Sequence, residues 1–173
     1  MLNGLDYQAR VTAGKAVEKE ILDVLRKAGL VIEEPTAEED MQDKIDGWIV
    51  RNGVRVAIQV KYREGGDDVI FELVKDIDRG IIGRDMESKA QIYIVMDTTD
   101  TIRMFDVAEI KKIAEFVKPM VLGELAVNPS KTNWGSRDAT CNVKITVDGR
   151  HGQRKLMAFF NPNKLKALGV WQK

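Results

Sequence analysis

Hydrophobic residues near the start of the chain recur at a helical spacing. They are Val17, Ile21, Val24, Leu25 and Ala28. A repeat of 3.6 residues is typical of a helix with one apolar face. Thr12 is suited to cap its first turn, and Gly29 is suited to end its last turn. The pattern therefore predicts a helix over residues 13–28.

Runs rich in β-forming residues follow the helix, after an acidic connector at residues 33–43. Residues 45–50 and 54–61 flank the segment Arg51-Asn52-Gly53. Asn-Gly between two such runs predicts a β-hairpin. Further strands are predicted over residues 69–73, 91–96 and 102–105.

Two other stretches in the middle of the chain have helical character. Residues 74–87 are a mixed helical stretch that Gly80 and Gly83 interrupt. Residues 107–117 predict a helix that Pro119 ends, because proline has no amide N–H to donate within a helix.

The last part of the chain has a different pattern. Residues 142–147 and 154–160 are alternating or β-rich runs joined by a turn-rich segment, which predicts a second hairpin. The segment Asn161-Pro162-Asn163 then introduces a predicted short helix that carries Lys164 and Lys166.

This order of elements predicts the fold class. It indicates an α/β fold with a mixed central sheet flanked by helices, followed by a C-terminal basic β-hairpin and short helix. A length of 173 residues is enough for one domain with a real core. We expect residues 1–130 to form the α/β core and residues 131–173 to form a basic C-terminal extension packed on the same domain.

Composition excludes several classes of protein. Hydrophobic residues make up 44% of the chain and charged residues 31%, which is ordinary for a folded globular protein. No apolar run is long enough for a membrane helix and no signal-peptide pattern opens the chain, so a cytoplasmic protein without a membrane partner is expected. One Cys and one His are too few for a structural zinc site, so any metal would be bound by oxygen atoms.

The charges balance overall but not locally. The chain has 27 Lys and Arg residues and 27 Asp and Glu residues. Residues 131–173 contain nine basic and two acidic residues, a net charge of +7, so residues 1–130 carry −7. Such a division is typical of an acidic region that carries the chemistry beside a basic region that binds the partner. A chance division of solvated surface charge explains it equally well.

Three polar residues of the first predicted hairpin are candidates for chemistry. Asp46 lies near the outer end of one strand, and Gln59 and Lys61 lie near the outer end of the next. Gln59 and Lys61 are two residues apart, so on a strand they share one face. A suitable register brings a carboxylate, an amide oxygen and an ammonium group together. Mg²⁺ prefers oxygen ligands, and phosphodiester hydrolysis needs an activated water and a cation for the developing charge.

These residues carry a family resemblance. Asp46 followed by Gln59-x-Lys61 resembles the D…(E/Q)xK signature of the PD-(D/E)XK nuclease superfamily. The segment Gly14-Lys-Ala-Val-Glu18-Lys-Glu-Ile21 is similar to the first helix of archaeal-type Holliday junction resolvases. The α-β-β-β-α-β order of residues 13–96 also fits the superfamily's core. The resemblance implies a restriction-endonuclease-like fold and covers roughly the first hundred residues.

The resemblance implies a role for each site residue. Asp46 would be the principal metal-bridging carboxylate, and Glu18 would complete the acidic site directly or through water. Gln59 would offer its carbonyl oxygen to the metal, and the backbone carbonyl of Val60 would be a further ligand. Lys61 would orient or help deprotonate the attacking water and stabilise transition-state charge. The implied cofactor is Mg²⁺, for which Mn²⁺ would substitute.

Two further observations qualify these roles. On a helical wheel Glu18 lies nearer the apolar face than Glu20, which independently favours Glu18. The superfamily usually has Glu or Asp where this chain has Gln59, and a neutral amide should weaken metal affinity. The substitution leaves room for a carboxylate that has migrated elsewhere, and Glu72 on the next predicted strand is a candidate. A solvated helix charge at Glu18 and a strand-end cation at Lys61 are the structural alternatives.

Six cations are candidates for contact with a phosphate backbone. They are Lys15, Arg63, Lys131, Arg150, Arg154 and Lys155. A solvated hairpin that packs on the domain, or that forms a dimer contact, is the alternative role for the basic tail.

The function expected from the resemblance is that of a Mg²⁺-dependent deoxyribonuclease, an endonuclease similar to Holliday junction resolvases. Its partner would be DNA, with branched DNA as one form of it, and a homodimer is expected because two symmetric nicks resolve a junction. Two alternatives stay open. One is another nuclease of the superfamily acting on flaps, ends or single strands. The other is a DNA-binding module with a degenerate site.

Overall fold

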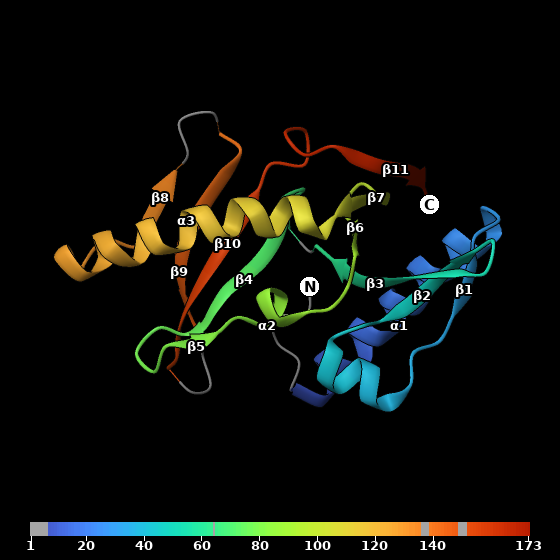
Figure 1. Ribbon diagram of the computed structural model, residues 1–173, viewed down its shortest axis with the longest axis horizontal. Coiled ribbons are helices and arrows are strands. Elements are labelled where there is room, and N and C mark those ends of the chain that lie inside the picture. Colours follow the sequence, from blue (N-terminus) through green and yellow to red (C-terminus); the bar gives the residue numbers. More distant parts are fainter. Residues whose placement is uncertain (1–6, 64, 136–138, 149–151) are drawn as a thin grey trace.

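The chain forms a mixed α/β fold with two sheets (Figure 1). The computed structural model describes residues 7–63, 65–135, 139–148 and 152–173, with side chains from residue 12 onward. The first sheet has the spatial order β1 (Val31–Glu33), β2 (Gly47–Arg51), β3 (Val54–Tyr62), β6 (Ile92–Met96), β7 (Thr101–Asp106) and β11 (Ala167–Gln172). The second has the order β5 (Ile81–Ile82), β4 (Val69–Asp76), β10 (Arg154–Phe160), β9 (Cys141–Val147) and β8 (Asn133–Gly135).

Four helical segments accompany the sheets. They are α1 (Tyr7–Lys27), a single π-helical turn η1 (Glu39–Asp43), α2 (Arg84–Glu87) and α3 (Val107–Val127). In Figure 1, α1 lies beside the β1–β3 part of the first sheet and α3 runs along the second. No helix in the described ranges is both long enough and apolar enough to cross a membrane.

The helix α1 packs on the first sheet through the predicted apolar positions. Ile21 and Leu25 are fully buried, in one cluster with Ile58 and Val60 of β3. The predicted stop at Gly29 is confirmed, since this residue has a φ of 94°. The predicted start after Thr12 is wrong, because the helix begins at Tyr7.

The first hairpin is confirmed with the predicted turn. β2 and β3 pair antiparallel from Gly47 opposite Ile58 to Arg51 opposite Val54. Asn52 and Gly53 form the two-residue connection with φ values of 51° and 77°. Both values lie in the left-handed region that this tight turn requires, which explains the Asn-Gly sequence.

The connection from β3 to β6 determines what covers the site. These two strands run parallel, with Gln59 opposite Tyr93. A chain that joins parallel strands must return to the same end of the sheet. Here the return passes through β4, β5 and α2, and it brings Asp85 of α2 to Gln59 and Lys61, on the face of β3 opposite α1. The helical stretch predicted over residues 74–87 is confirmed only at α2 and is wrong before it, since β4 extends to Asp76 and β5 spans Ile81–Ile82.

The predicted end of the third helix is also wrong. The helix α3 continues through Pro119 to Val127. Ile110 and Ala114 are buried before the proline, and Val121 and Leu125 are buried after it. Packing on both sides of Pro119 outweighs the lost hydrogen bond and keeps the segment helical.

The C-terminal part joins both sheets. The second hairpin is confirmed as β9 and β10, and β10 pairs with β4. The short helix predicted after residues 161–163 is wrong, because a turn there leads into β11, which pairs with β7. Trp171 of β11 packs against the apolar cluster under α1. The strand lies there because the edge of β7 offers both hydrogen-bonding groups and apolar surface.

Candidate functional site

Asp46 is held at the outer end of the β2–β3 hairpin. Its side chain is 8% exposed, and its Oδ2 accepts a hydrogen bond of 2.7 Å from the Val60 amide. Its own amide donates to Ile58. Burial raises the pKa of the Asp46 carboxyl, whereas the Val60 N–H and the charges of Lys61 and Arg84 act in the opposite direction. A carboxylate fixed by a backbone amide in this way is well ordered for binding a cation.

Glu18 reaches the same place from α1. It lines a hollow of about 440 Å³ together with Lys15, Asp40 and Asp46. Burial, followed by the charges of Asp46 and Asp40, raises the pKa of Glu18 to about 7, and Lys15 and Arg84 oppose this effect. Glu18 and Asp46 therefore form an acidic pair whose negative charge is incompletely balanced.

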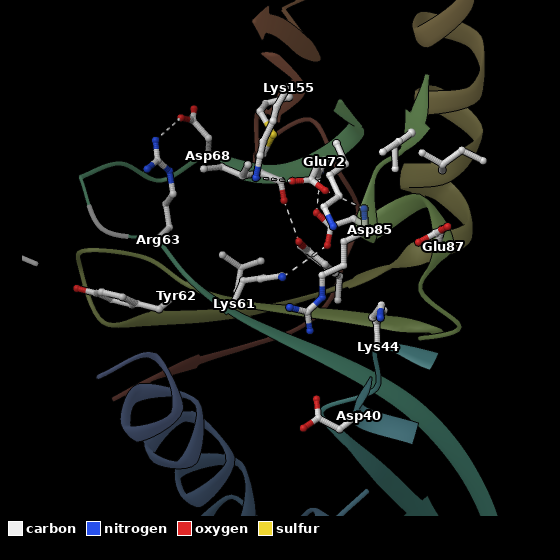
Figure 2. A pocket seen from close by; sticks show the side chains of 18 of the residues that line it. Asp40, Lys44, Lys61, Tyr62, Arg63, Asp68, Glu72, Asp85, Glu87 and Lys155 are labelled. Carbon is white, nitrogen blue, oxygen red and sulfur yellow. Dashed lines mark hydrogen bonds and ion pairs between the residues drawn. The ribbon is translucent and has the colours of Figure 1, made fainter. Parts of the chain in front are cut away.

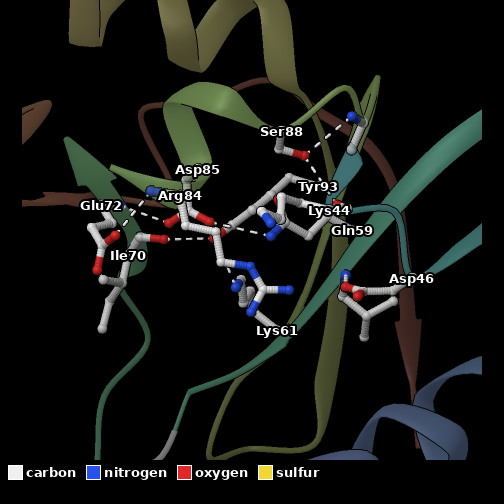
Figure 3. A network of polar contacts seen from close by, with 12 residues as sticks. Lys44, Asp46, Gln59, Lys61, Ile70, Glu72, Arg84, Asp85, Ser88 and Tyr93 are labelled. Atoms are coloured by element: carbon white, nitrogen blue, oxygen red, sulfur yellow. Dashed lines mark hydrogen bonds and ion pairs between the residues drawn. The ribbon is translucent and has the colours of Figure 1, made fainter. Parts of the chain in front are cut away.

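Gln59 and Lys61 lie on the other face of β3, as their spacing predicts. Ile58 and Val60 alternate with them and face α1. Gln59 is 1% exposed, and its Nε2 donates to Asp85 Oδ1 at 3.2 Å. The Lys61 Nζ lies 3.5 Å from the same Asp85 oxygen. Figure 3 shows these side chains meeting under α2.

Asp85 was not among the residues expected at the site. It comes from α2 and is 5% exposed, and its Oδ2 accepts a hydrogen bond of 2.7 Å from the Glu72 amide. The preceding Gly83 allows this contact, because a Cβ there would overlap the Glu72 carbonyl oxygen. Asp85 lies 26 residues after Gln59, inside a segment expected to be helical, so no local pattern pointed to it.

Glu72, the candidate for a migrated carboxylate, lies beside Asp85 but contacts neither Gln59 nor Lys61 in the described interactions. Its Oε1 accepts a hydrogen bond from the Arg84 amide at 2.9 Å, and its Oε2 lies 3.4 Å from Lys155 Nζ. Asp85 is thus the carboxylate that contacts both Gln59 and Lys61, and Glu72 supports its loop.

A cleft of about 950 Å³ opens next to Lys61 (Figure 2). Arg63 and Lys155, two of the predicted phosphate contacts, line it. Arg63 lies 3.4 Å from Asp68, and Lys155 lies between Glu72 and Asp148. Acidic side chains alternate with basic ones along the cleft walls, so the cleft is not a uniformly positive channel.

The other predicted phosphate contacts lie in different places. Lys15 is highly exposed and lies 4.0 Å from Asp40, beside Glu18. Lys131 pairs with Glu124 on α3, and Arg154 pairs with Asp78 through two nitrogen atoms. Arg150 lies outside the described residues. The structure therefore brings Arg63 and Lys155 to the cleft beside Lys61 and does not bring Lys131 or Arg154 there.

The ligands implied for a metal were Asp46, Gln59, Val60 and Glu18. Within the described part of the chain, no three Asp, Glu, His or Cys side chains cluster closely enough to hold a metal ion. A cation at this site would rest on two carboxylates, an amide or backbone oxygen, and water. That donor set fits Mg²⁺, which commonly binds through one or two carboxylates and retains several waters.

Comparisons with protein-family models, with curated proteins and with solved structures found no match for the chain.

Proposed function

We propose that the chain is a Mg²⁺-dependent deoxyribonuclease that hydrolyses phosphodiester bonds. The observation that supports this most is the placement of polar groups at the end of the β2–β3 hairpin, where Glu18 and Asp46 line one hollow and β3 carries Lys61. The charge of Asp46 raises the pKa of Glu18, and the charge of Lys61 lowers that of Asp46. Two under-neutralised carboxylates with a nearby ammonium group are the groups that metal-assisted attack on a phosphodiester requires.

The proposed fold is restriction-endonuclease-like in its first part. In support, α1 covers one face of a β2–β3 hairpin, and β6 runs parallel to β3 beside it. The third strand of the expected core departs from this arrangement, since β4 pairs with β10 in the second sheet. The likeness therefore concerns α1, β2, β3 and β6, the elements that hold the proposed site.

Each site residue has a proposed role. Asp46 and Glu18 hold the cation, and Gln59 offers its amide oxygen from the adjoining end of β3. The backbone carbonyl of Val60 is proposed as a further ligand. Bound Mg²⁺ would lower the pKa of a coordinated water and neutralise phosphate charge. Lys61 orients the attacking water and stabilises the negative charge that develops on the phosphate.

DNA is the proposed partner. We propose that the substrate is branched DNA and that a homodimer cuts it. Arg63 and Lys155 would bind phosphates in the cleft beside Lys61. Both are already close to acidic side chains, so a phosphate would have to replace these partners. We expect the resulting affinity to fall steeply with salt.

The test is a cleavage assay with four-way junction, flap, single-stranded and duplex DNA. Cleavage should require Mg²⁺ or Mn²⁺ and stop with a chelator. Lys61→Ala should lower kcat by about 10²–10³-fold, the usual cost of one transition-state contact. Asp46→Ala should abolish metal-dependent cleavage.

Lys118→Ala is a suitable control, because it removes a partly buried lysine from α3, away from the cleft. It should cleave at the wild-type rate. Activity that survives the chelator or both site substitutions would contradict the proposal. Binding of DNA without cleavage of any of the four substrates would favour a degenerate binding module, with Gln59 as the cause.

A further inference from the structure

The contact between Gln59 and Asp85 lets a glutamine serve where a carboxylate is usual. Either oxygen of a carboxylate can face a metal. A glutamine side chain ends in one oxygen and one NH₂ group, and only the oxygen can bind a cation. A buried glutamine at a metal site therefore needs a neighbour that selects one of its two orientations.

Asp85 is placed to make that selection. Its Oδ1 accepts from Gln59 Nε2 at 3.2 Å, and an ionised carboxylate has no proton to donate to an amide oxygen. The amide nitrogen is thus kept on the Asp85 side, and Oε1 points away from Asp85. In the view of Figure 3, Gln59 lies between Asp85 and Asp46.

Asp85 is itself fixed by the backbone. Its second oxygen accepts from the Glu72 amide on β4 at 2.7 Å, so the carboxylate cannot rotate freely. Its first oxygen also lies 3.5 Å from Lys61 Nζ. One buried carboxylate thus holds both Gln59 and Lys61.

We infer that Asp85 is a positioning residue that orients the Gln59 amide, so that its oxygen faces the Asp46 side of the site, and that holds Lys61 beside it. Asp85 acts through these two residues and does not bind the cation itself. The expected effect on metal binding and cleavage rests on the proposed function, whereas the orientation of the Gln59 amide does not. Supporting residues that orient metal ligands typically change metal affinity by about 10- to 100-fold when altered.

The substitution Asp85→Asn gives a defined structural expectation. The oxygen of the new side chain should stay on the fixed Glu72 amide, which leaves its NH₂ group facing position 59. The Gln59 amide must then reverse and present its oxygen to that NH₂ group. The Gln59 nitrogen would face the cation, and affinity for Mn²⁺ in the absence of DNA should fall by about 10- to 100-fold.

The reciprocal exchange is the decisive variant. In Q59E alone, two carboxylates meet across the 3.2 Å contact and should destabilise the protein. In Q59E/D85N, the NH₂ group introduced at position 85 donates to the carboxylate introduced at position 59, whose other oxygen is free to bind a cation. The double variant should therefore recover thermal stability, Mn²⁺ affinity and cleavage that each single variant loses.

A metal-free measurement separates this inference from the proposed function. The side-chain NH₂ signals of Gln59, identified by NMR through their loss in Q59E, should shift in D85N when the amide reverses. Unchanged signals would overturn the inference, whether or not the protein cleaves DNA. Losses in stability that simply add in the double variant would overturn it as well, and this comparison remains available if D85N alone fails to fold. If wild type neither binds Mn²⁺ nor cleaves DNA but the amide shift and the stability recovery are seen, the proposed function fails and the positioning role stands.

Discussion

Glu18 and Asp46 show what burial does to two neighbouring carboxylates. Both have a raised pKa, chiefly because the surrounding protein replaces water. For Asp46, the hydrogen bond from the Val60 amide and the charge of Lys61 offset part of this rise in pKa. Glu18 has no comparable hydrogen bond among the described contacts, and its pKa rises to about 7. At neutral pH a proton and a divalent cation would therefore compete for Glu18.

The pH dependence of stability tests this state of Glu18. A carboxyl with a raised pKa favours the folded state when protonated, so its stabilising effect is complete below pH 4.5 and is lost as pH rises through about 7. Glu18→Gln mimics the protonated form. The gain in free energy of unfolding over wild type should be larger at pH 8 than at pH 5, as measured by urea denaturation.

Glu115→Gln on the exposed side of α3 is the control, because it makes the same substitution far from Glu18 and Asp46. Added Mg²⁺ should raise the melting temperature of wild type more at pH 8 than at pH 6. A Glu18→Gln gain that is equal at both pH values would contradict the raised pKa.

At the scale of elements, the approach of α2 to β4 determines how Asp85 contacts Gln59 and Lys61. Gly83 donates a hydrogen bond to the Leu73 carbonyl at 3.1 Å, and no side chain fits between the two segments at this point. Its φ of −70° is ordinary. The requirement for glycine is therefore one of space rather than of backbone conformation.

Gly83→Ala tests this close approach. The added Cβ must push α2 from β4, which should cost about 1–3 kcal/mol of stability and weaken the Asp85 contacts. Gly123→Ala is the matched control, since Gly123 is an exposed position of α3 and a Cβ there meets nothing within 4 Å. That variant should gain about 0.5–1 kcal/mol. Thermal unfolding measures both, and equal effects would contradict the steric explanation.

At the scale of the whole molecule, the C-terminal strands are part of both sheets. β10 is the neighbour of β4, and Leu156, Ala158 and Phe160 of β10 are fully buried. The tail also contributes cations to acidic groups of the first 130 residues, with Arg154 on Asp78 and Lys173 on Glu20. The opposite charges of the two parts are thus partly offset within the fold, which leaves less free positive surface than the sequence suggested.

Removal of residues 131–173 tests the predicted division of the chain at residue 130. The shortened chain would lose the partners of β4 and β7 and would expose apolar surface on both sheets. We expect it to lack a cooperative thermal transition and dispersed amide signals in NMR spectra. A fragment that unfolds cooperatively, near the wild-type melting temperature, would show instead that residues 1–130 form a domain on their own.

Much of the fold and part of the site could be predicted from the sequence. The apolar period of α1, the Asn52-Gly53 turn and the alternation that puts Gln59 and Lys61 on one face depend on neighbouring residues, so the sequence alone determined them. The path of the chain through Pro119 and the strand that replaced a predicted C-terminal helix depended on distant packing. Asp85 belongs to this second class, because only the crossover from β3 to β6 brings it to Gln59 and Lys61. Local periodicity reports which face a side chain occupies, and the tertiary structure decides what it meets there.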